Sequence, residues 1–209
     1  MGKYSKMMVF LKEKLVFFAT PKTASTSIEM ALGTTCDIRI SKVPNAKHTP
    51  YRKYQRLLEP FIMSLTGDEP DTVAVIREPT EWLGSWYRYR SRAELKGSKN
   101  STADISFDQF IESYLSDDPK PFARIGSQAK FMSDKNGDVG MSHLFRYDDI
   151  DGLVRFLQNR IGKQFQLGRA NQSPKAELDL SPKLRIELKK ILAPDYEIYD
   201  RLRPATDID

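Results

Sequence analysis

Short apolar runs alternate with amphipathic segments through the first half of the chain. Residues 15–20 (LVFFAT) and residues 72–76 (TVAVI) are almost continuously apolar, which is typical of strands buried on both faces of a sheet. Residues 35–41 form a second, weaker strand candidate after the first run. Residues 142–147 form a further strand candidate, and Tyr-Asp-Asp stands where that strand ends. The pattern therefore predicts a sheet whose central strands are buried.

Helical periodicity separates these strands and dominates the second half. Residues 25–32 look like a helix closed by Gly33, and residues 50–63 place apolar side chains at helical spacing. The second half adds helix candidates at residues 107–115, 123–132, 150–161 and 182–192. Strands that alternate with helices of this length predict an α/β fold, with a central parallel sheet flanked by helices and a helical C-terminal half.

Composition narrows the class of protein. With 209 residues, 40% hydrophobic and 29% charged, the chain suits a single globular domain over residues 1–209. A net charge of +5 predicts a basic cleft for an anionic ligand rather than a nucleic-acid partner. One cysteine and two histidines rule out an intrachain disulfide and argue against a His/Cys metal site, so we expect no metal, although a carboxylate-bound magnesium ion stays open.

The hydropathy pattern also bears on localisation. No apolar run approaches the roughly 18 residues that a membrane-spanning helix needs, and the N-terminus lacks the layout of a signal peptide. We therefore expect no membrane span and a cytoplasmic location.

The loop after the first buried strand is rich in groups that bind phosphate. It leads into a helix N-terminus, where backbone N–H groups and the helix dipole favour an anion. Its members are Pro21, Lys22, Thr23, Ala24, Ser25, Thr26 and Ser27. A polar turn with an ordinary Ser/Thr N-cap is the alternative interpretation. The Walker A motif does not fit, because no glycine lies near Lys22.

The segment LVFFATPKTASTSIEMAL resembles the 5′-phosphosulfate-binding loop of sulfotransferases that use 3′-phosphoadenosine 5′-phosphosulfate (PAPS). That loop reads Pro-Lys-[Thr/Ser]-Gly-[Thr/Ser]-[Thr/Ser], and Ala24 stands here in place of the glycine. If the backbone needs a positive φ there, alanine is strained. The resemblance implies that Lys22 is catalytic and stabilises charge on the leaving oxygen. It also implies a P-loop-like form of the α/β fold.

A second phosphate-binding pattern follows the strand at residues 72–76. Arg77 ends this strand and Ser85 lies eight residues later in a predicted helix. The pattern V-x-V-I-R-x-P-x-x-x-x-x-S resembles the 3′-phosphate-binding segment of the same family, so the resemblance assigns Arg77 and Ser85 to that phosphate. A surface salt bridge and a tolerated helical serine are the alternative. We expect the aromatic side chains of the helix to be core residues, namely Trp82, Trp86 and Tyr87.

Weaker resemblances complete the candidate site. Tyr147 corresponds to a tyrosine that can lie near adenine in the family. A late polar loop resembles the family's Asn-x-Ser loop near the donor, and it contributes Asn171, Ser173 and Lys175. Sulfation of a hydroxyl needs a base, and His48 is our candidate, with Glu29 as the alternative. We expect His143 to be structural.

The resemblance spans residues 14–202. It implies an enzyme that transfers a sulfuryl group from PAPS, leaving 3′-phosphoadenosine 5′-phosphate (PAP), to a hydroxyl or amine. The acceptor is unidentified, and we expect a small molecule or glycan, namely a carbohydrate or a small metabolite. Two other interpretations stay open at this point: a small-molecule kinase of the P-loop class, and a non-catalytic nucleotide-binding module.

Overall fold

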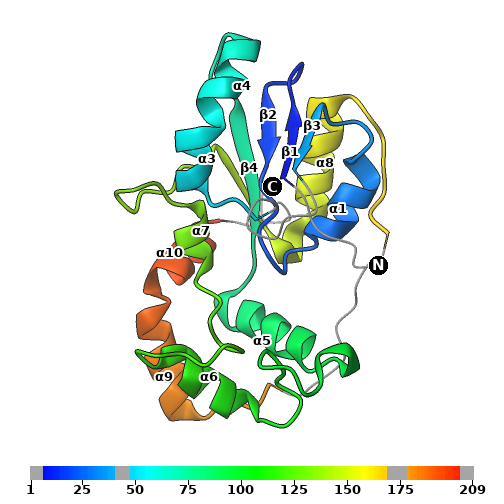
Figure 1. Cartoon of the computed structure of the whole chain (residues 1–209). Helices are drawn as coiled ribbons and strands as arrows, with labels where there is room; N and C mark the ends of the chain where they lie inside the picture. Colours follow the sequence, from blue (N-terminus) through cyan, green and yellow to red (C-terminus); the bar gives the residue numbers. More distant parts are fainter. Residues whose placement is uncertain (1–6, 41–47, 169–177, 203–209) are drawn as a thin grey trace, which may run out of the picture. The chain divides into compact units, whose positions relative to one another are not determined.

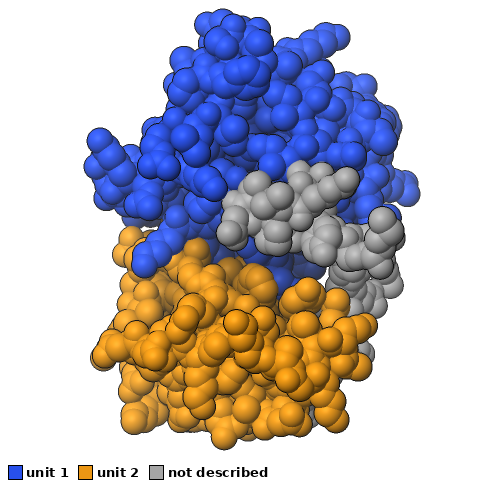
Figure 2. Space-filling view, in the orientation of Figure 1, with its two compact units in different colours: residues 1–77, 128–171, 201–209 blue, residues 78–127, 172–200 orange. Residues whose placement is uncertain are grey.

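The computed structural model describes residues 7–40, 48–168 and 178–202 (Figure 1). The chain divides into two compact units, distinguished by colour in Figure 2. Unit 1 comprises residues 1–77, 128–171 and 201–209, and unit 2 comprises residues 78–127 and 172–200. The sheet belongs to unit 1, whereas the described part of unit 2 is helical. The predicted single domain over residues 1–209 stays a prediction.

The described residues of unit 1 form one sheet of five strands in the order β3-β1-β2-β4-β5. The strands are β1 (Met7–Phe10), β2 (Leu15–Phe17), β3 (Ile38–Ile40), β4 (Asp71–Ile76) and β5 (His143–Arg146). The β2–β4 and β4–β5 pairs are parallel, whereas β1 pairs antiparallel with both β2 and β3. The predicted parallel sheet is thus correct for β2, β4 and β5. It is wrong at β1, which forms a hairpin with β2 through the charged turn at residues 11–14.

Helices cover both faces of this sheet, with α1 (Ser25–Leu32) and α8 (Ile150–Ile161) on one side and α3 (Tyr51–Leu57) and α4 (Glu59–Thr66) on the other (Figure 1). Because successive strand residues point to opposite faces, Phe17 joins the core cluster beneath α1 and α8, together with Ile28 and Leu153. Phe18 points the other way, and its ring centroid lies 5.0 Å from that of Tyr54. The predicted α/β layering is therefore confirmed in unit 1.

Two predicted helices of unit 1 are shorter or broken. The helix expected over residues 50–63 is split into α3 and α4 at Leu58, whose φ is −113°. Pro60 explains the break, because its ring lacks an N–H and clashes with the carbonyl four residues earlier. The helix expected over residues 123–132 is reduced to α7 (Gln128–Met132), since Gly126 has a φ of 72° and interrupts it.

In the part of unit 2 that the structure describes, four α-helices pack around a core of aromatic and aliphatic side chains. They are α5 (Pro79–Arg90), α6 (Phe107–Leu115), α9 (Pro182–Ile191) and α10 (Ala193–Arg201), with a 3₁₀ turn, η1 (Ala93–Leu95). The core includes Trp82, Phe110 and Leu188, and Trp86 and Tyr87 pack against it, as predicted. Helix α6 begins with a capping box in which Ser106 and Gln109 satisfy each other's backbone N–H groups.

Candidate donor-binding site

Three neighbouring strands of unit 1 end at the same edge of the sheet, and each is followed by a predicted site residue. Phe17 of β2 pairs with Val73 of β4, and Ile76 of β4 pairs with Arg146 of β5. Phe18 N–H also bonds to the Val73 carbonyl at 2.8 Å, which continues the alignment toward the loop. Because parallel strands share their carboxyl edge, the loop after β2, Arg77 and Tyr147 emerge side by side.

The loop after β2 has an unusual backbone. Lys22 and Ala24 both have left-handed conformations, with φ values of 68° and 58°. Ala24 is the N-cap of α1, and its carbonyl accepts the N–H groups of Ser27 at 2.8 Å and Ile28 at 3.2 Å. Alternation of left-handed and right-handed residues turns successive N–H groups toward one concave surface, which is a common way to bind phosphate. The helix dipole of α1 adds partial positive charge at the same point.

The backbone of Ala24 has a positive φ, which is the conformation in which alanine is strained. At the position where the resemblance places a glycine, the backbone of this chain is left-handed, and alanine occupies it. A left-handed conformation costs an L-residue with a Cβ about 1–2 kcal/mol. The neighbouring contacts therefore hold the loop in a conformation that Ala24 itself disfavours, as expected of a loop shaped for a ligand.

The hydroxyl groups of the loop divide into two kinds. Thr23, Ser25 and Ser27 are buried, and the Thr23 hydroxyl donates to the Thr20 carbonyl at 2.9 Å. The Thr23 hydroxyl therefore helps to shape the loop. Lys22 and Thr26 are partly exposed and stand at the loop surface, together with Pro21 and Ala24.

Arg77 is fixed at the end of β4 by a side chain that the sequence analysis missed. Arg77 N–H donates to Oε1 of Gln128 at 2.9 Å, and Nε2 of Gln128 donates to the Arg77 carbonyl at 2.8 Å. Gln128 is fully buried and lies 51 residues away in sequence. No local pattern marks this contact. It holds the backbone of Arg77 much as a neighbouring strand would.

The guanidinium of Arg77 lies over the ring of Tyr147, with Cζ 4.6 Å from the ring centroid. This cation–π contact unites two residues that the sequence analysis assigned to different parts of one nucleotide. Tyr147 begins the 3₁₀ turn η2 (Tyr147–Asp149) directly after β5, and its ring packs partly against the core beneath α8.

His48 is anchored beside the loop. Its Nδ1 lies 2.7 Å from the carbonyl oxygen of Ala19, two residues before Pro21. A carbonyl can only accept, so Nδ1 carries the proton, and in the neutral ring Nε2 is the basic nitrogen. The alternative base, Glu29, extends toward the other end of α1, since its Cγ lies beside Gly33. The geometry therefore favours His48 over Glu29.

The other predicted site residues are not brought into this cluster by the described contacts. Ser85 lies in the middle of α5, in unit 2, and is buried. Asn171, Ser173 and Lys175 lie outside the described residues, so their assignments stay predictions. His143, expected to be structural, begins β5 at the opposite end of that strand. It lies 3.8 Å from the carboxylate of Asp71, and its ring contacts that of Phe156 at a tilt of 45°.

Among the described residues, no group of three or more His, Cys, Asp or Glu side chains gathers as a metal site would require. Within the same residues, no helix combines the length and the apolar character that crossing a membrane demands.

Comparison with known proteins supplies the family. The model of the family described as "Sulfotransferase family" matches residues 5–200, which covers both units. No curated protein and no solved structure matches the chain. This match over nearly the whole length of the chain assigns the activity class. The chain belongs to the sulfotransferase family and is a transferase enzyme that moves a sulfuryl group.

Proposed function

We propose that the sulfuryl donor is PAPS and that the acceptor is a hydroxyl or amine of a carbohydrate or small metabolite. The observation that carries the donor assignment is the meeting of three predicted donor contacts at one sheet edge of unit 1. They are the loop at residues 21–27, Arg77 and Tyr147. A nucleotide with phosphates at both its 5′ and 3′ ends needs two phosphate sites. This edge offers a loop with two left-handed residues at a helix N-terminus, and an arginine.

Each residue then has a distinct part in donor binding. The N–H groups of the loop hold the 5′-phosphosulfate, and Lys22 supplies a positive charge beside it. Arg77 binds the 3′-phosphate with Ser85, while Tyr147 contacts the adenine and steadies the guanidinium. The loop containing Asn171, Ser173 and Lys175 adds further donor contacts.

Lys22 and His48 carry the chemistry in this proposal. As the bond from sulfur to the 5′-phosphate oxygen breaks, Lys22 stabilises the negative charge that grows on that oxygen. Nε2 of His48 accepts the proton of the acceptor hydroxyl as its oxygen bonds to sulfur. The Ala19 carbonyl fixes the ring orientation through Nδ1. No step in this sequence uses a metal ion.

The two alternatives make different demands. A P-loop kinase would share the strand–loop–helix arrangement but needs a magnesium site, and the family match does not support it. A non-catalytic nucleotide-binding module would keep the loop without needing the ammonium group of Lys22.

Calorimetric binding of PAP, ADP and ATP, with and without magnesium, tests the donor. We expect micromolar PAP binding that is independent of magnesium. Arg77→Ala removes charge-assisted contacts of about 1.5–3 kcal/mol, so it should weaken PAP about 10- to 150-fold. Arg160→Ala is the matched control, because Arg160 pairs with Asp71 at the start of β4, the end opposite Arg77.

Turnover separates an enzyme from a binding module. Lys22→Ala should reduce release of PAP from PAPS by about 10²-fold or more, by analogy with the loss of other charge-stabilising donors. A preference for ATP with magnesium would overturn the proposal in favour of a kinase. PAP binding without release of PAP from PAPS, in both the wild type and Lys22→Ala, would instead favour the module.

A further inference from the structure

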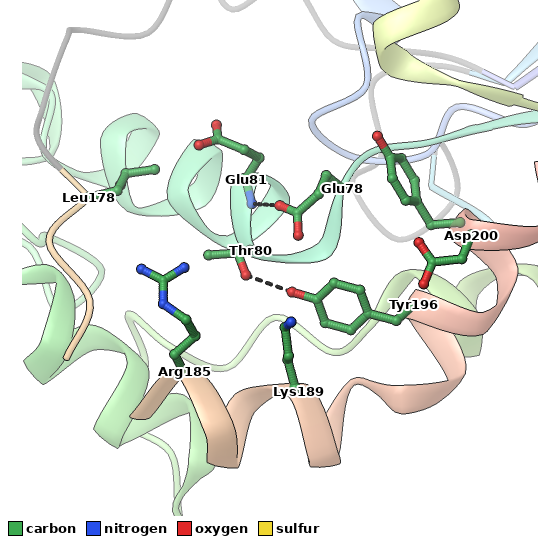
Figure 3. Close-up of a pocket in the computed structure, with 9 residues that line it drawn as sticks. Glu78, Thr80, Glu81, Leu178, Arg185, Lys189, Tyr196 and Asp200 are labelled. Carbon is green, nitrogen blue, oxygen red and sulfur yellow. Dashed lines mark hydrogen bonds between the residues drawn. The ribbon is translucent and has the colours of Figure 1, made fainter. Parts of the chain in front are cut away.

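Unit 2 contains a cavity of about 470 Å³ that the donor site does not use (Figure 3). It is lined from the start of α5, from α9 and from α10, and all its lining residues lie between Glu78 and Asp200, within unit 2. Its volume falls in the range of roughly 300–1,000 Å³ that is usual for small-molecule sites.

One wall of the cavity is cationic. Arg185 and Lys189 lie one helical turn apart on α9, and Figure 3 shows both side chains rising from that helix into the cavity. Neither forms an ion pair within 4.0 Å with any residue that the structure describes. The ammonium of Lys189 is 5.9 Å from the ring centroid of Tyr196, which is a weak contact. Two positive charges therefore face the cavity without an ion pair to any described carboxylate.

The other walls carry three carboxylates, and that of Asp200 has no hydrogen-bond or ion-pair partner among the described residues. Glu78 accepts the backbone N–H of Glu81 at 2.7 Å, and Glu81 accepts from Arg88 at 3.2 Å. Asp200 of α10 also lines the cavity, and its carboxylate forms no hydrogen bond or ion pair with another described residue. The carboxylate of Asp200 is therefore able to take a positively charged or hydroxyl donor from a ligand.

A neutral hydrogen bond lies between these walls. The hydroxyls of Thr80 and Tyr196 are 2.7 Å apart and tie α5 to α10 (Figure 3). Burial raises the pKa of Tyr196 to about 12, so this phenol stays uncharged at neutral pH. Arg185 and Lys189 lie on one side of the Tyr196 ring and Asp200 on the other, while the Glu78 carboxylate lies near the Tyr196 hydroxyl (Figure 3).

We propose that this cavity binds a small zwitterion, whose acidic group pairs with Arg185 and Lys189 and whose ammonium group pairs with Asp200. A simple anion or a simple cation would satisfy one wall and be repelled by the other, whereas a molecule that carries both charges satisfies both. The concave surface strengthens these attractions, because less water screens them than on an open surface. This inference goes beyond the proposed donor chemistry and does not depend on it, since every lining residue belongs to unit 2.

The test uses three probes of equal carbon number: 4-aminobutyrate, butyrate and butylammonium. The chain is titrated with each, and amide chemical shifts are followed by NMR at Thr80, Leu178 and Lys189. We expect saturable shifts with 4-aminobutyrate and a Kd at least about fivefold lower than with either singly charged probe. Equal Kd values for 4-aminobutyrate and butyrate, or no shifts at these amides, would overturn the proposal.

Matched variants test which side chains pair with the acidic group and which with the ammonium group of the ligand. Arg185→Gln combined with Lys189→Gln should weaken 4-aminobutyrate binding about fivefold or more without weakening butylammonium binding. Asp200→Asn should do the reverse, weakening 4-aminobutyrate but not butyrate. The control, Lys183→Gln with Lys190→Gln, removes the same charge from the same helix at positions outside the cavity. An equal loss in that control would mean a general charge effect and would also overturn the proposal.

Discussion

At the scale of single residues, Ala24 holds a backbone conformation that alanine disfavours, with φ at 58° and ψ at 12°. Ala24→Gly removes the clash of the Cβ atom but increases the freedom of the unfolded chain, and the first effect is the larger. We therefore expect the free energy of unfolding to rise by up to about 1 kcal/mol. Denaturant unfolding of the two proteins measures the difference.

Ala31→Gly is the matched control for this variant, because Ala31 lies inside α1 with helical geometry. Glycine in a helix interior costs roughly 0.5–1 kcal/mol, so this substitution should destabilise the chain. If both substitutions destabilised it equally, Ala24 would not be strained in solution.

His48→Asn separates the two ring nitrogens of the candidate base. Asparagine can place its amide nitrogen where Nδ1 stands and still donate to the Ala19 carbonyl. It has no basic nitrogen, so we expect turnover to fall about 10²- to 10⁴-fold and the low-pH limb of the kcat/KM profile to disappear. PAP affinity should change less than about twofold, because the loop keeps its anchor.

His143→Asn serves as the control for His48, since His143 lies at the amino end of β5 beside Asp71. It should leave the pH profile unchanged. Retention of wild-type turnover in His48→Asn would show that another group removes the proton, with Glu29 as the next candidate.

These two residues also show how far sequence reasoning reaches. The loop could be predicted because Pro-Lys-Thr is followed directly by a helix start. The strain at Ala24 could be predicted because Ala24 stands where the family has glycine. Both inferences use only residues that are neighbours in the sequence. The contact between His48 and Ala19 spans 29 positions. Only the fold determines which carbonyl a histidine meets at that separation, so the tautomer of His48 could not be predicted.

At the scale of elements, α7 fixes the end of β4 through Gln128. Both of its amide atoms bond to the backbone of Arg77 in a buried setting. Gln128→Ala leaves the backbone N–H and carbonyl of Arg77 without these partners, which should destabilise the chain by about 1–3 kcal/mol. The loss of alignment should also weaken PAP severalfold, as calorimetry would measure.

Gln128→Glu distinguishes alignment from simple packing. Glutamate keeps the size and the acceptor for the Arg77 N–H, but when ionised it cannot donate to the Arg77 carbonyl. We expect a free energy of unfolding below wild type in this variant too. Wild-type stability and PAP affinity in both Gln128 variants would show that the contact has no positioning role.

Elements themselves were predicted unevenly, for physical reasons. Helices α6 and α8 have the predicted bounds, since their apolar periodicity is regular and each has a polar N-cap residue. Strand β1 was missed because it has only four residues, MMVF, and is followed by a charged turn. The break between α3 and α4 follows from Pro60, a local signal that the apolar periodicity across residues 50–63 outweighed.

At the scale of the whole molecule, the chain passes between the two units four times, at residues 77–78, 127–128, 171–172 and 200–201. Neither unit is a continuous segment, and the family match covers both. We therefore expect the units to unfold together as one domain. The chain offers a direct probe, because both of its tryptophans, Trp82 and Trp86, lie in unit 2, whereas the sheet lies in unit 1.

Thermal unfolding followed by tryptophan fluorescence reports unit 2, and far-UV circular dichroism reports the whole chain. One domain predicts coincident midpoints by the two probes.

PAP at about 100 times its Kd should stabilise the chain by about 2.7 kcal/mol. Since the loop, Arg77 and Tyr147 belong to unit 1, a fluorescence midpoint that rises with PAP as far as the circular dichroism midpoint means that unit 2 unfolds only with unit 1. In Arg77→Ala, PAP should raise the fluorescence midpoint and the circular dichroism midpoint by less than in the wild type, and by equal amounts. A fluorescence midpoint that PAP leaves in place would instead divide the chain into two domains that unfold independently.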